Sequence, residues 1–348
     1  MKSLFSVPLK GGNITEVYSF SSIDELISYL SGFSTNSLYV FDENSAKPFP
    51  SIPEGSLILP PGEKEKNWAS IDRILTKALE RGMARDSLFI AIGGGVILDM
   101  TAFAASVYMR GARCILVPTT LLSAVDATLG GKTGIDYGGA KNIVGTFFPS
   151  ESVLICPDTL KTLSDREYRC GLGEVVKHAF LSDNTVLYEF LSENREAILA
   201  RESSVVSEMI NLSLAVKIQY IAKDPEEKLG IRSCLNLGHT FGHALEALKG
   251  YSVSHGEGVA WGMVRAFRAG CDLGITSGEY SSRAISLIKS FGFDTDYRID
   301  GKDFPFFLKA ISKDKKKKDG TVRFILMEGQ GKPVLSELPD DEIRKVSC

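Results

Sequence analysis

Four polar side chains of the types that bind metals or anions are spaced to share one face of a helix. At about 100° per residue, Arg232, Asn236, His239 and His243 fall within roughly 60° of one another. Two imidazoles at positions i and i+4 can bind one metal ion, although a solvated polar face has the same spacing. The chain has only 4 histidines, and His239, His243 and His255 lie close together in the sequence. This scarcity favours a metal-binding or catalytic role for them.

A catalytic zinc site needs about three protein ligands, and a carboxylate often supplies one of them. Glu174 is a candidate, because it lies in the segment GLGEVVK (171–177) at the start or along the side of an expected helix. An ion pair with Lys177, one turn further along, would explain Glu174 equally well. Spacing alone does not choose between Glu174 and the other acidic residues.

Two glycine-rich segments could hold phosphate groups. Gly93–Gly95 lies where an expected strand gives way to a helix, a place where backbone N–H groups and the helix dipole favour anions. The spacing is not G-x-G-x-x-G, so a plain Rossmann fingerprint is absent. Asp42, at the end of an earlier strand, could accept hydrogen bonds from a ribose hydroxyl. The second segment, residues 118–145, is expected to be a long functional loop in which Lys132 and Lys141 follow glycines.

The elements that position these residues change in type along the chain. Strands are expected at 37–41, 56–59, 87–92 and 114–117, with helices at 67–81 and 98–109, which predicts βαβ units and a parallel sheet. Helices are expected at 166–181, 184–200, 203–222, 233–249, 256–275 and 280–291, before a strand at 321–327. We therefore expect a Rossmann-like α/β NAD-binding domain over 1–157 and a mainly α-helical metal- and substrate-binding domain over 158–348.

Composition excludes several classes of protein. The 348 residues are 44% hydrophobic and 24% charged, as in a soluble globular protein. No apolar run approaches the ~20 residues of a membrane span, and the N-terminal segment does not resemble a signal peptide. A net charge of −3 argues against non-specific nucleic-acid binding. The 6 cysteines include no CxxC pair, which predicts reduced thiols and a cytoplasmic location.

Six motifs in this order resemble the 3-dehydroquinate synthase family, within the sugar-phosphate cyclase group, over nearly the whole chain. They are GGGVILD (93–99), PTTLLSAVDATLGGKTGI (118–135), KNIVGTFF (141–148), GEVVK (173–177), LNLGHTFGHALE (235–246) and SHGEGVAWGM (254–263). The wider fold resembles that of iron-containing and glycerol dehydrogenases, which hold a metal between an NAD domain and a helical domain. Three positions depart from the family pattern. They are Leu98 in place of glycine, Gly173 in place of alanine, and a loop over 224–232 that is one residue longer.

The resemblance implies roles for individual residues. Those implied as metal ligands, for Zn2+ or Co2+, are Glu174, His239 and His255. Those implied as NAD contacts are Asp42, Asn44, Glu63, Lys66, Gly94, Gly95, Val96, Asp99, Thr119, Thr120, Lys132, Lys141, Thr159, Thr162, Leu163 and Glu167. Those implied as the substrate and catalytic shell are Asp126, Lys132, Asn142, Lys177, Lys217, Arg232, Asn236 and His243, with Lys315 and Lys316 from the run KDKKKK (313–318). Arg110 matches an arginine that the family supplies across a homodimer interface.

The implied reaction converts 3-deoxy-D-arabino-heptulosonate 7-phosphate to 3-dehydroquinate and phosphate. It combines transient oxidation by NAD, β-elimination of phosphate, re-reduction and an intramolecular aldol closure. Three alternatives remain at this point. They are a related cyclase whose substrate has no carboxylate, a metal-dependent alcohol dehydrogenase of the glycerol dehydrogenase type, and a non-catalytic metal- or nucleotide-binding module.

Overall fold

The computed structural model describes residues 1–9, 12–33, 36–225, 227–314 and 322–348. They form two compact units, Met1–Ser164 (unit 1) and Asp165–Cys348 (unit 2). The sequence places the division earlier, near Pro157. The later division reflects the short 3-10 helix η5 (Pro157–Thr162), which belongs to unit 1. Its Thr159 Oγ1 lies 2.8 Å from the carbonyl oxygen of Cys156 and 3.4 Å from that of Pro118.

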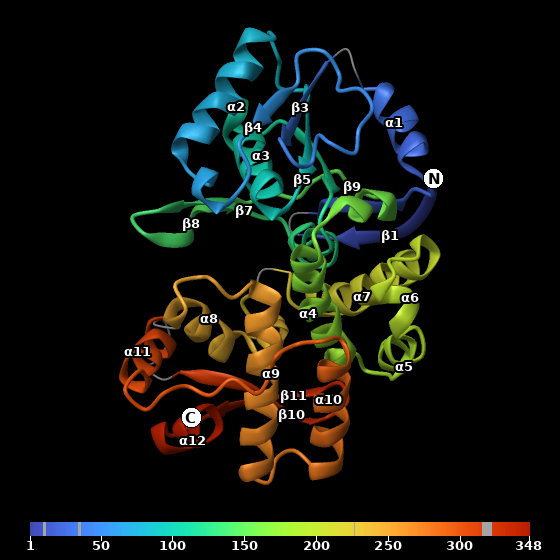
Figure 1. Ribbon diagram of the computed structural model, residues 1–348. Helices are drawn as coiled ribbons and strands as arrows, with labels where there is room; N and C mark the ends of the chain where they lie inside the picture. The colour runs from blue at the N-terminus through green and yellow to red at the C-terminus, as the bar shows by residue number, and fades with distance from the viewer. Residues whose placement is uncertain (10–11, 34–35, 226, 315–321) are drawn as a thin grey trace. The chain divides into compact units, whose positions relative to one another are not determined.

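A seven-stranded sheet forms the centre of unit 1 (Figure 1). Its strands are β1 (Lys2–Pro8), β2 (Ile14–Ser19), β3 (Ser37–Asp42), β4 (Leu57–Leu59), β5 (Leu88–Gly93), β6 (Arg113–Pro118) and β9 (Ser152–Ile155), in the order β1-β2-β9-β6-β5-β3-β4. All neighbours pair in parallel except β1 and β2. The α/β class is confirmed, but the sequence analysis missed β1, β2 and β9, and with them the antiparallel edge.

The helices of unit 1 are α1 (Ile23–Ser31), α2 (Trp68–Glu80) and α3 (Gly95–Val107). Leu26 and Leu30 of α1 pack with Tyr39, Phe41 and other sheet residues in one apolar cluster. Most of α3 is buried, which agrees with its nearly continuous apolar sequence. This helix begins at Gly95, earlier than expected, and its N-cap Gly94 follows the last residue of β5, Gly93.

The segment 118–145 is not the long loop expected from its sequence. It contains a π-helical turn, Ser123–Ala127, and the antiparallel hairpin β7 (Lys132–Tyr137) and β8 (Ala140–Phe147). Gly138 and Gly139 form the tip of the hairpin with φ of 59° and 78°. Two adjacent glycines suit a two-residue hairpin turn, because both positions need positive φ. The pair Gly138-Gly139 was therefore a hairpin signal in the sequence, but the high glycine content of the segment led us to expect a loop.

Unit 2 is mainly helical, as expected (Figure 1). Its elements are α4 (Asp165–Leu181), α5 (Val186–Glu193), α6 (Arg195–Leu199), α7 (Ser203–Lys223), the 3-10 helix η6 (Arg232–Asn236), α8 (His239–Leu248), α9 (His255–Asp272), α10 (Gly278–Ser290), α11 (Phe304–Asp314), β10 (Arg323–Gly329), β11 (Lys332–Glu337) and α12 (Asp340–Ser347). Two expected helices are each divided. The helix expected over 184–200 breaks at Asn194, and that over 233–249 breaks where Gly238, with φ of 80°, separates η6 from α8.

Among the described residues, α7 is the helix that is long and apolar enough to cross a membrane by length and composition. This is weak evidence, because core helices of folded units pass the same test. Met209, Ile210 and Leu214 of α7 are buried. The helix packs against α4 and α5 of unit 2. We therefore interpret α7 as a helix of the folded unit.

Glycines allow α4 and α8 to approach α9 at backbone distance. A Cβ on Gly262 would lie 2.0 Å from the Gly238 carbonyl oxygen, and one on Gly242 would lie 2.7 Å from Gly258. A Cβ on Gly173 would lie 2.5 Å from the carbonyl oxygen of Gly256. This last contact explains why the present backbone requires glycine at position 173. These contacts bring together the helices that carry Glu174, His239 and His255.

Gly262→Ala should destabilise the protein, because its methyl group would meet backbone that cannot move aside. We expect a loss of roughly 1–3 kcal/mol in the free energy of unfolding, as for other overpacked cores. The matched control is Gly278→Ala in the first turn of α10, where an added Cβ has no neighbour within 4 Å among the described atoms. Urea unfolding of both variants measures the difference. Equal stability of the two would contradict the close helix contact.

Candidate active site

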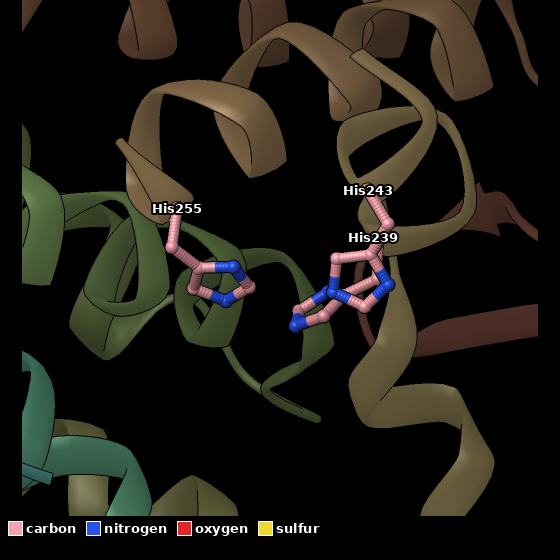
Figure 2. A group of neighbouring side chains, drawn as sticks. All are labelled: His239, His243 and His255. Carbon is pink, nitrogen blue, oxygen red and sulfur yellow. The ribbon is translucent and has the colours of Figure 1, made fainter. Parts of the chain in front are cut away.

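The three clustered histidines of the sequence meet in unit 2 (Figure 2). His239 and His243 lie one turn apart on α8, and His255 is the first residue of α9. Their ring centroids are 5.1–5.6 Å apart. One ligand nitrogen from each lies within 4.8 Å of the others. This spacing is compatible with a shared metal ion or a shared polar ligand.

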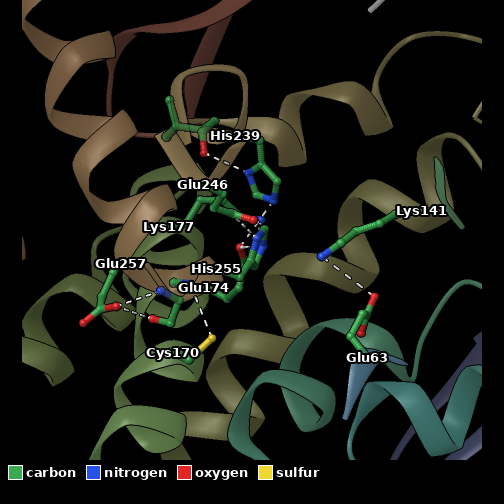
Figure 3. Close-up of polar contacts among 12 residues, drawn as sticks. Glu63, Lys141, Cys170, Glu174, Lys177, His239, Glu246, His255 and Glu257 are labelled. Atoms are coloured by element: carbon green, nitrogen blue, oxygen red, sulfur yellow. Dashed lines mark hydrogen bonds and ion pairs between the residues drawn. The ribbon is translucent and has the colours of Figure 1, made fainter. Parts of the chain in front are cut away.

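Glu174 of α4 completes a donor set for a metal with two of these histidines (Figure 3). Its Oε1 atom lies 3.4 Å from Nε2 of His239 and 3.4 Å from Nε2 of His255. This oxygen is buried and forms no hydrogen bond of normal geometry with any described residue. Its other oxygen, Oε2, pairs with Lys177. The ion pair with Lys177 is therefore present, and the metal-ligand interpretation stays a prediction; two nitrogens with one carboxylate oxygen suit Zn2+ or Co2+.

The charges around Glu174 keep it ionised. Burial raises the pKa of a carboxyl, but Lys177 and His255 hold that of Glu174 well below its usual value. Burial, followed by Lys177, lowers the pKa of His239 well below its usual value. This leaves a neutral imidazole with a free lone pair. Burial also disfavours the charged form of His255, but contacts with Glu174 and Glu246 raise its pKa to about 10.

Glu246 contacts the histidine cluster, and the sequence analysis gave it no role. Its Oε1 lies 3.0 Å from Nδ1 of His255 and accepts a hydrogen bond from it, which turns Nε2 of that ring toward Glu174 (Figure 3). A carboxylate on the far nitrogen commonly orients a metal-binding histidine. A signal for this role was present, because Glu246 lies on α8 two helical turns after His239. Its partner His255, however, comes from a different helix.

Arg232 and Asn236 reach their positions through η6 and not through the helix of the histidines. Arg232, Asn236, His239 and His243 therefore do not share one helix face as predicted, because Gly238 separates η6 from α8. The Arg232 side chain is 5% exposed, and its Nη1 has no hydrogen-bond partner among the described residues. Lys217 is 4% exposed on α7, against which η6 packs. Two buried cationic side chains in this region suit an anionic ligand group.

Five of the residues proposed to contact NAD lie at one edge of the unit 1 sheet. Asp42 ends β3, Gly94 and Gly95 follow β5, and Thr119 and Thr120 follow β6. Because β3, β5 and β6 are parallel neighbours, their carboxyl ends meet at the same edge. Here the N-terminus of α3 offers backbone N–H groups to a phosphate. The edge therefore has the features that a dinucleotide requires.

Local hydrogen bonds fix this edge. Oδ1 of Asp42 accepts the N–H groups of Asn44, at 2.8 Å, and Ser45, at 2.7 Å. The N–H of Thr119 donates to the carbonyl of Gly93 at 2.9 Å, which joins the two loops after β5 and β6. These bonds hold the turns in place without a ligand.

Lys66 links the NAD edge with β8. Its Nζ lies 2.6 Å from Oδ2 of Asp99 and 2.5 Å from Oδ1 of Asn142. The backbone N–H of Asn142 donates to Oδ1 of Asp136 at 2.8 Å. Burial raises the pKa of Asp99, and Lys66 opposes this. The network therefore brings two predicted NAD contacts, Lys66 and Asp99, together with the predicted substrate residue Asn142.

The remaining predicted residues occupy defined places in their units. Lys141 lies 3.9 Å from Glu63 (Figure 3). In unit 1, Val96 is in the first turn of α3, Asp126 is in the π-helical turn and Lys132 begins β7. Thr159 and Thr162 are in η5, and Leu163 follows it. Glu167 is in the first turn of α4. Arg110 follows α3 with φ of 64°. Leu98 is buried in α3. Lys315 and Lys316 lie outside the described residues.

Solved structures with the same fold define the class of protein. A crystal structure of 2-deoxy-scyllo-inosose synthase, complexed with carbaglucose-6-phosphate, NAD+ and Co2+, matches with a TM-score of 0.84 at 22% identity over 99% of both chains. 2-epi-5-epi-valiolone synthase from Streptomyces hygroscopicus, with NAD+ and Zn2+ bound, matches with 0.85 at 22% identity over 95% of both chains. A probable glycerol dehydrogenase from Sinorhizobium meliloti matches with a TM-score of 0.62. The fold is that of the sugar-phosphate cyclases.

Sequence comparison identifies the family within this class. The model of the 3-dehydroquinate synthase N-terminal domain matches residues 56–170, and that of the C-terminal domain matches 171–317. 3-Dehydroquinate synthases of Dictyoglomus thermophilum and Nostoc punctiforme are each 41% identical to this chain over 84% of its length, covering 81% and 80% of theirs. The chain belongs to the 3-dehydroquinate synthase family. Its activity is the 3-dehydroquinate synthase reaction (EC 4.2.3.4) of the shikimate pathway.

Glu246→Gln should weaken metal binding, because the neutral amide no longer holds His255 with a charged acceptor. We expect a loss of about tenfold in zinc affinity, the lower end of such effects. Competition with a chromogenic chelator measures this without turnover. Glu193→Gln, at the exposed end of α5, is the matched control. An unchanged affinity in Glu246→Gln would mean that this carboxylate does not support the metal ligand.

Proposed function

We propose that this chain converts 3-deoxy-D-arabino-heptulosonate 7-phosphate to 3-dehydroquinate and phosphate with the residues described above. One observation carries the assignment. Unit 2 pairs the donor set of Glu174, His239 and His255 with the buried guanidinium of Arg232, whose Nη1 has no partner among the described residues. The metal set suits oxidation at a hydroxyl-bearing carbon, and the guanidinium suits a carboxylate on the same substrate.

We assign NAD to the strand edge of unit 1 and a divalent metal to Glu174, His239 and His255. NAD+ and Co2+ or Zn2+ are bound in two solved proteins of the same fold, which supports this assignment. When bound, the metal lowers the pKa of a substrate hydroxyl and the nicotinamide exchanges a hydride with the substrate carbon. The hydride is returned within each turnover, so we expect no net change in NAD.

The protein side chains bind and orient the substrate at its two charged ends. Arg232 and Lys217 receive the carboxylate, for which a guanidinium offers two parallel hydrogen bonds. Asn236 and Lys177 of unit 2 belong to the same substrate shell. Holding both ends fixes the open-chain intermediate for cyclisation, because an oriented intramolecular aldol step avoids most of the entropic cost.

We assign His243 of unit 2 to the phosphate that leaves during β-elimination. The ketone formed at C5 acidifies the neighbouring C–H, and the departing phosphate can itself take that proton. In this assignment His243 is not a metal ligand, although it lies in the histidine cluster. The role that we assign to His243 is therefore to hold the leaving phosphate and to stabilise the charge of that phosphate.

The carboxylate end separates this assignment from related activities. Cyclases that act on glucose 6-phosphate or sedoheptulose 7-phosphate take substrates that have no carboxylate, so a buried Arg232 would lack a partner there. Purified protein with heptulosonate phosphate, NAD+ and Zn2+ should release phosphate, form dehydroquinate and stop when the metal is chelated. Release of phosphate from either of the other sugars, or accumulation of NADH, would overturn the substrate assignment.

His243→Ala should abolish most phosphate release while zinc remains bound, because His243 acts on the leaving group. His239→Ala should lose zinc, because it removes a metal ligand. We expect turnover to fall by at least about a hundredfold in each variant. Metal content by atomic absorption, measured beside phosphate release, separates the two. Loss of stoichiometric zinc in His243→Ala would place that residue among the metal ligands.

We also propose a homodimer that acts in the cytoplasm. Exposed apolar side chains of unit 1 include Val107 and Met109, just before Arg110 in the sequence, and Ile143 and Phe147 of β8; they are 42–59% exposed. Thr146 Oγ1 of β8 lies 2.9 Å from Ser106 Oγ of α3, which brings together the segments that carry them. Such a patch suits a second copy of the chain. Sedimentation equilibrium tests the dimer.

All six cysteines are free, which fits a reducing compartment.

A further inference from the structure

The loop before Arg232 is organised around one buried carboxylate, that of Asp224. Its Oδ1 accepts the backbone N–H of Lys228 at 2.8 Å and that of Leu229 at 3.1 Å. Its Oδ2 accepts the backbone N–H of Arg232 at 3.2 Å. Asp224 is 1% exposed, so water does not replace these bonds. A single side chain at the end of α7 therefore holds both the middle and the end of the loop.

The bond to Arg232 falls at the first residue of η6. The opening N–H groups of a helix have no partner within the helix, and a carboxylate is the preferred acceptor for them. η6 is only five residues long, and a short 3-10 helix has little stability of its own. Asp224 thus provides, from outside η6, the hydrogen-bond acceptor that the first N–H group of η6 lacks within the helix.

The segment that begins at this bond carries three of the residues proposed for the substrate in unit 2, namely Arg232, Asn236 and His243. Arg232 and Asn236 lie in η6, and after the turn at Gly238 the chain enters α8 with His239 and His243. The guanidinium of Arg232 is buried and has a nitrogen without a partner among the described residues. A buried donor of this kind binds a carboxylate well only if its backbone is fixed beforehand, because bidentate geometry is strict.

We propose that Asp224 is a positioning residue for recognition of the substrate carboxylate. It fixes the backbone of Arg232, so that the guanidinium is preorganised for the ligand before binding. This inference rests on the proposed role of Arg232. It adds that the carboxylate end of the site depends on Asp224, whereas the phosphate end does not.

Two products of the reaction separate the two ends of the site. 3-Dehydroquinate keeps the carboxylate but has lost the phosphate, whereas inorganic phosphate carries only the leaving group. Their inhibition constants can be measured against the same substrate. In Asp224→Asn the amide retains the size of the side chain, but it lacks the charge and places a donor against at least one backbone N–H. We expect the inhibition constant of dehydroquinate to rise roughly tenfold or more, and that of phosphate to change less than about twofold.

The matched control is Asp300→Asn. Asp300 is exposed in unit 2 and also accepts a backbone N–H, that of Lys302 at 3.1 Å. We expect both inhibition constants to remain unchanged in this variant. Asp224→Glu keeps the charge and should recover part of the affinity for dehydroquinate. If Asp224→Asn does not fold, Asp224→Glu is the test instead. We then expect this variant to bind dehydroquinate more weakly than the unsubstituted protein does, and to bind phosphate as tightly as that protein.

Arg232→Met distinguishes failure of this inference from failure of the proposed function. If Arg232→Met weakens dehydroquinate binding and Asp224→Asn does not, Asp224 is not a positioning residue and the role of Arg232 stands. If Arg232→Met leaves dehydroquinate binding unchanged, the carboxylate assignment itself is wrong. If Asp224→Asn weakens dehydroquinate and phosphate equally, Asp224 supports the fold in general and the inference is overturned.

Discussion

The buried carboxylate of Glu174 imposes the strictest requirement on unit 2. A buried charge costs several kcal/mol unless opposite charges and polar partners surround it. Here α4 supplies Lys177, α8 supplies His239 and α9 supplies His255. Three helices must therefore meet at one point, and each must present a particular side chain to it. The carboxylate oxygen and the two imidazole nitrogens that meet here are donor types that suit a divalent metal.

Small residues make this meeting possible. At Gly173, Gly238, Gly242 and Gly262 a single added methyl group would collide with the backbone of a neighbouring helix or loop. The end of α4 is also held from a distance, because Gln330 Nε2 in the β10–β11 turn donates to the carbonyl oxygens of Ala179, at 2.6 Å, and Ser182, at 2.8 Å. The helix that carries Glu174 is thus fixed along one side and at its C-terminal end.

Unit 1 meets a different requirement by ordinary α/β geometry. Parallel pairing of β3, β5 and β6 brings Asp42, Gly94 and Thr119 to one edge, although they are far apart in the sequence. No unusual backbone is needed there, and short turns suffice. The two units thus divide the chemistry. Unit 1 offers an edge suited to a dinucleotide, and unit 2 offers metal ligands and cationic groups suited to an anionic sugar.

The sequence by itself determined the residue types of the site, the two fold classes and, through its motifs, the family. These follow from local signals such as a glycine turn after a strand or histidines one helical turn apart. It did not determine the hairpin over 132–147, the break at Gly238, or the partners of Glu246 and Asp224. Those depend on contacts between segments distant along the chain or on a backbone conformation set by packing. Glu174 shows the difference clearly. Its spacing allowed either a metal ligand or an ion pair with Lys177, and only the meeting of three helices placed Oε2 against Lys177 and Oε1 at 3.4 Å from both His239 and His255.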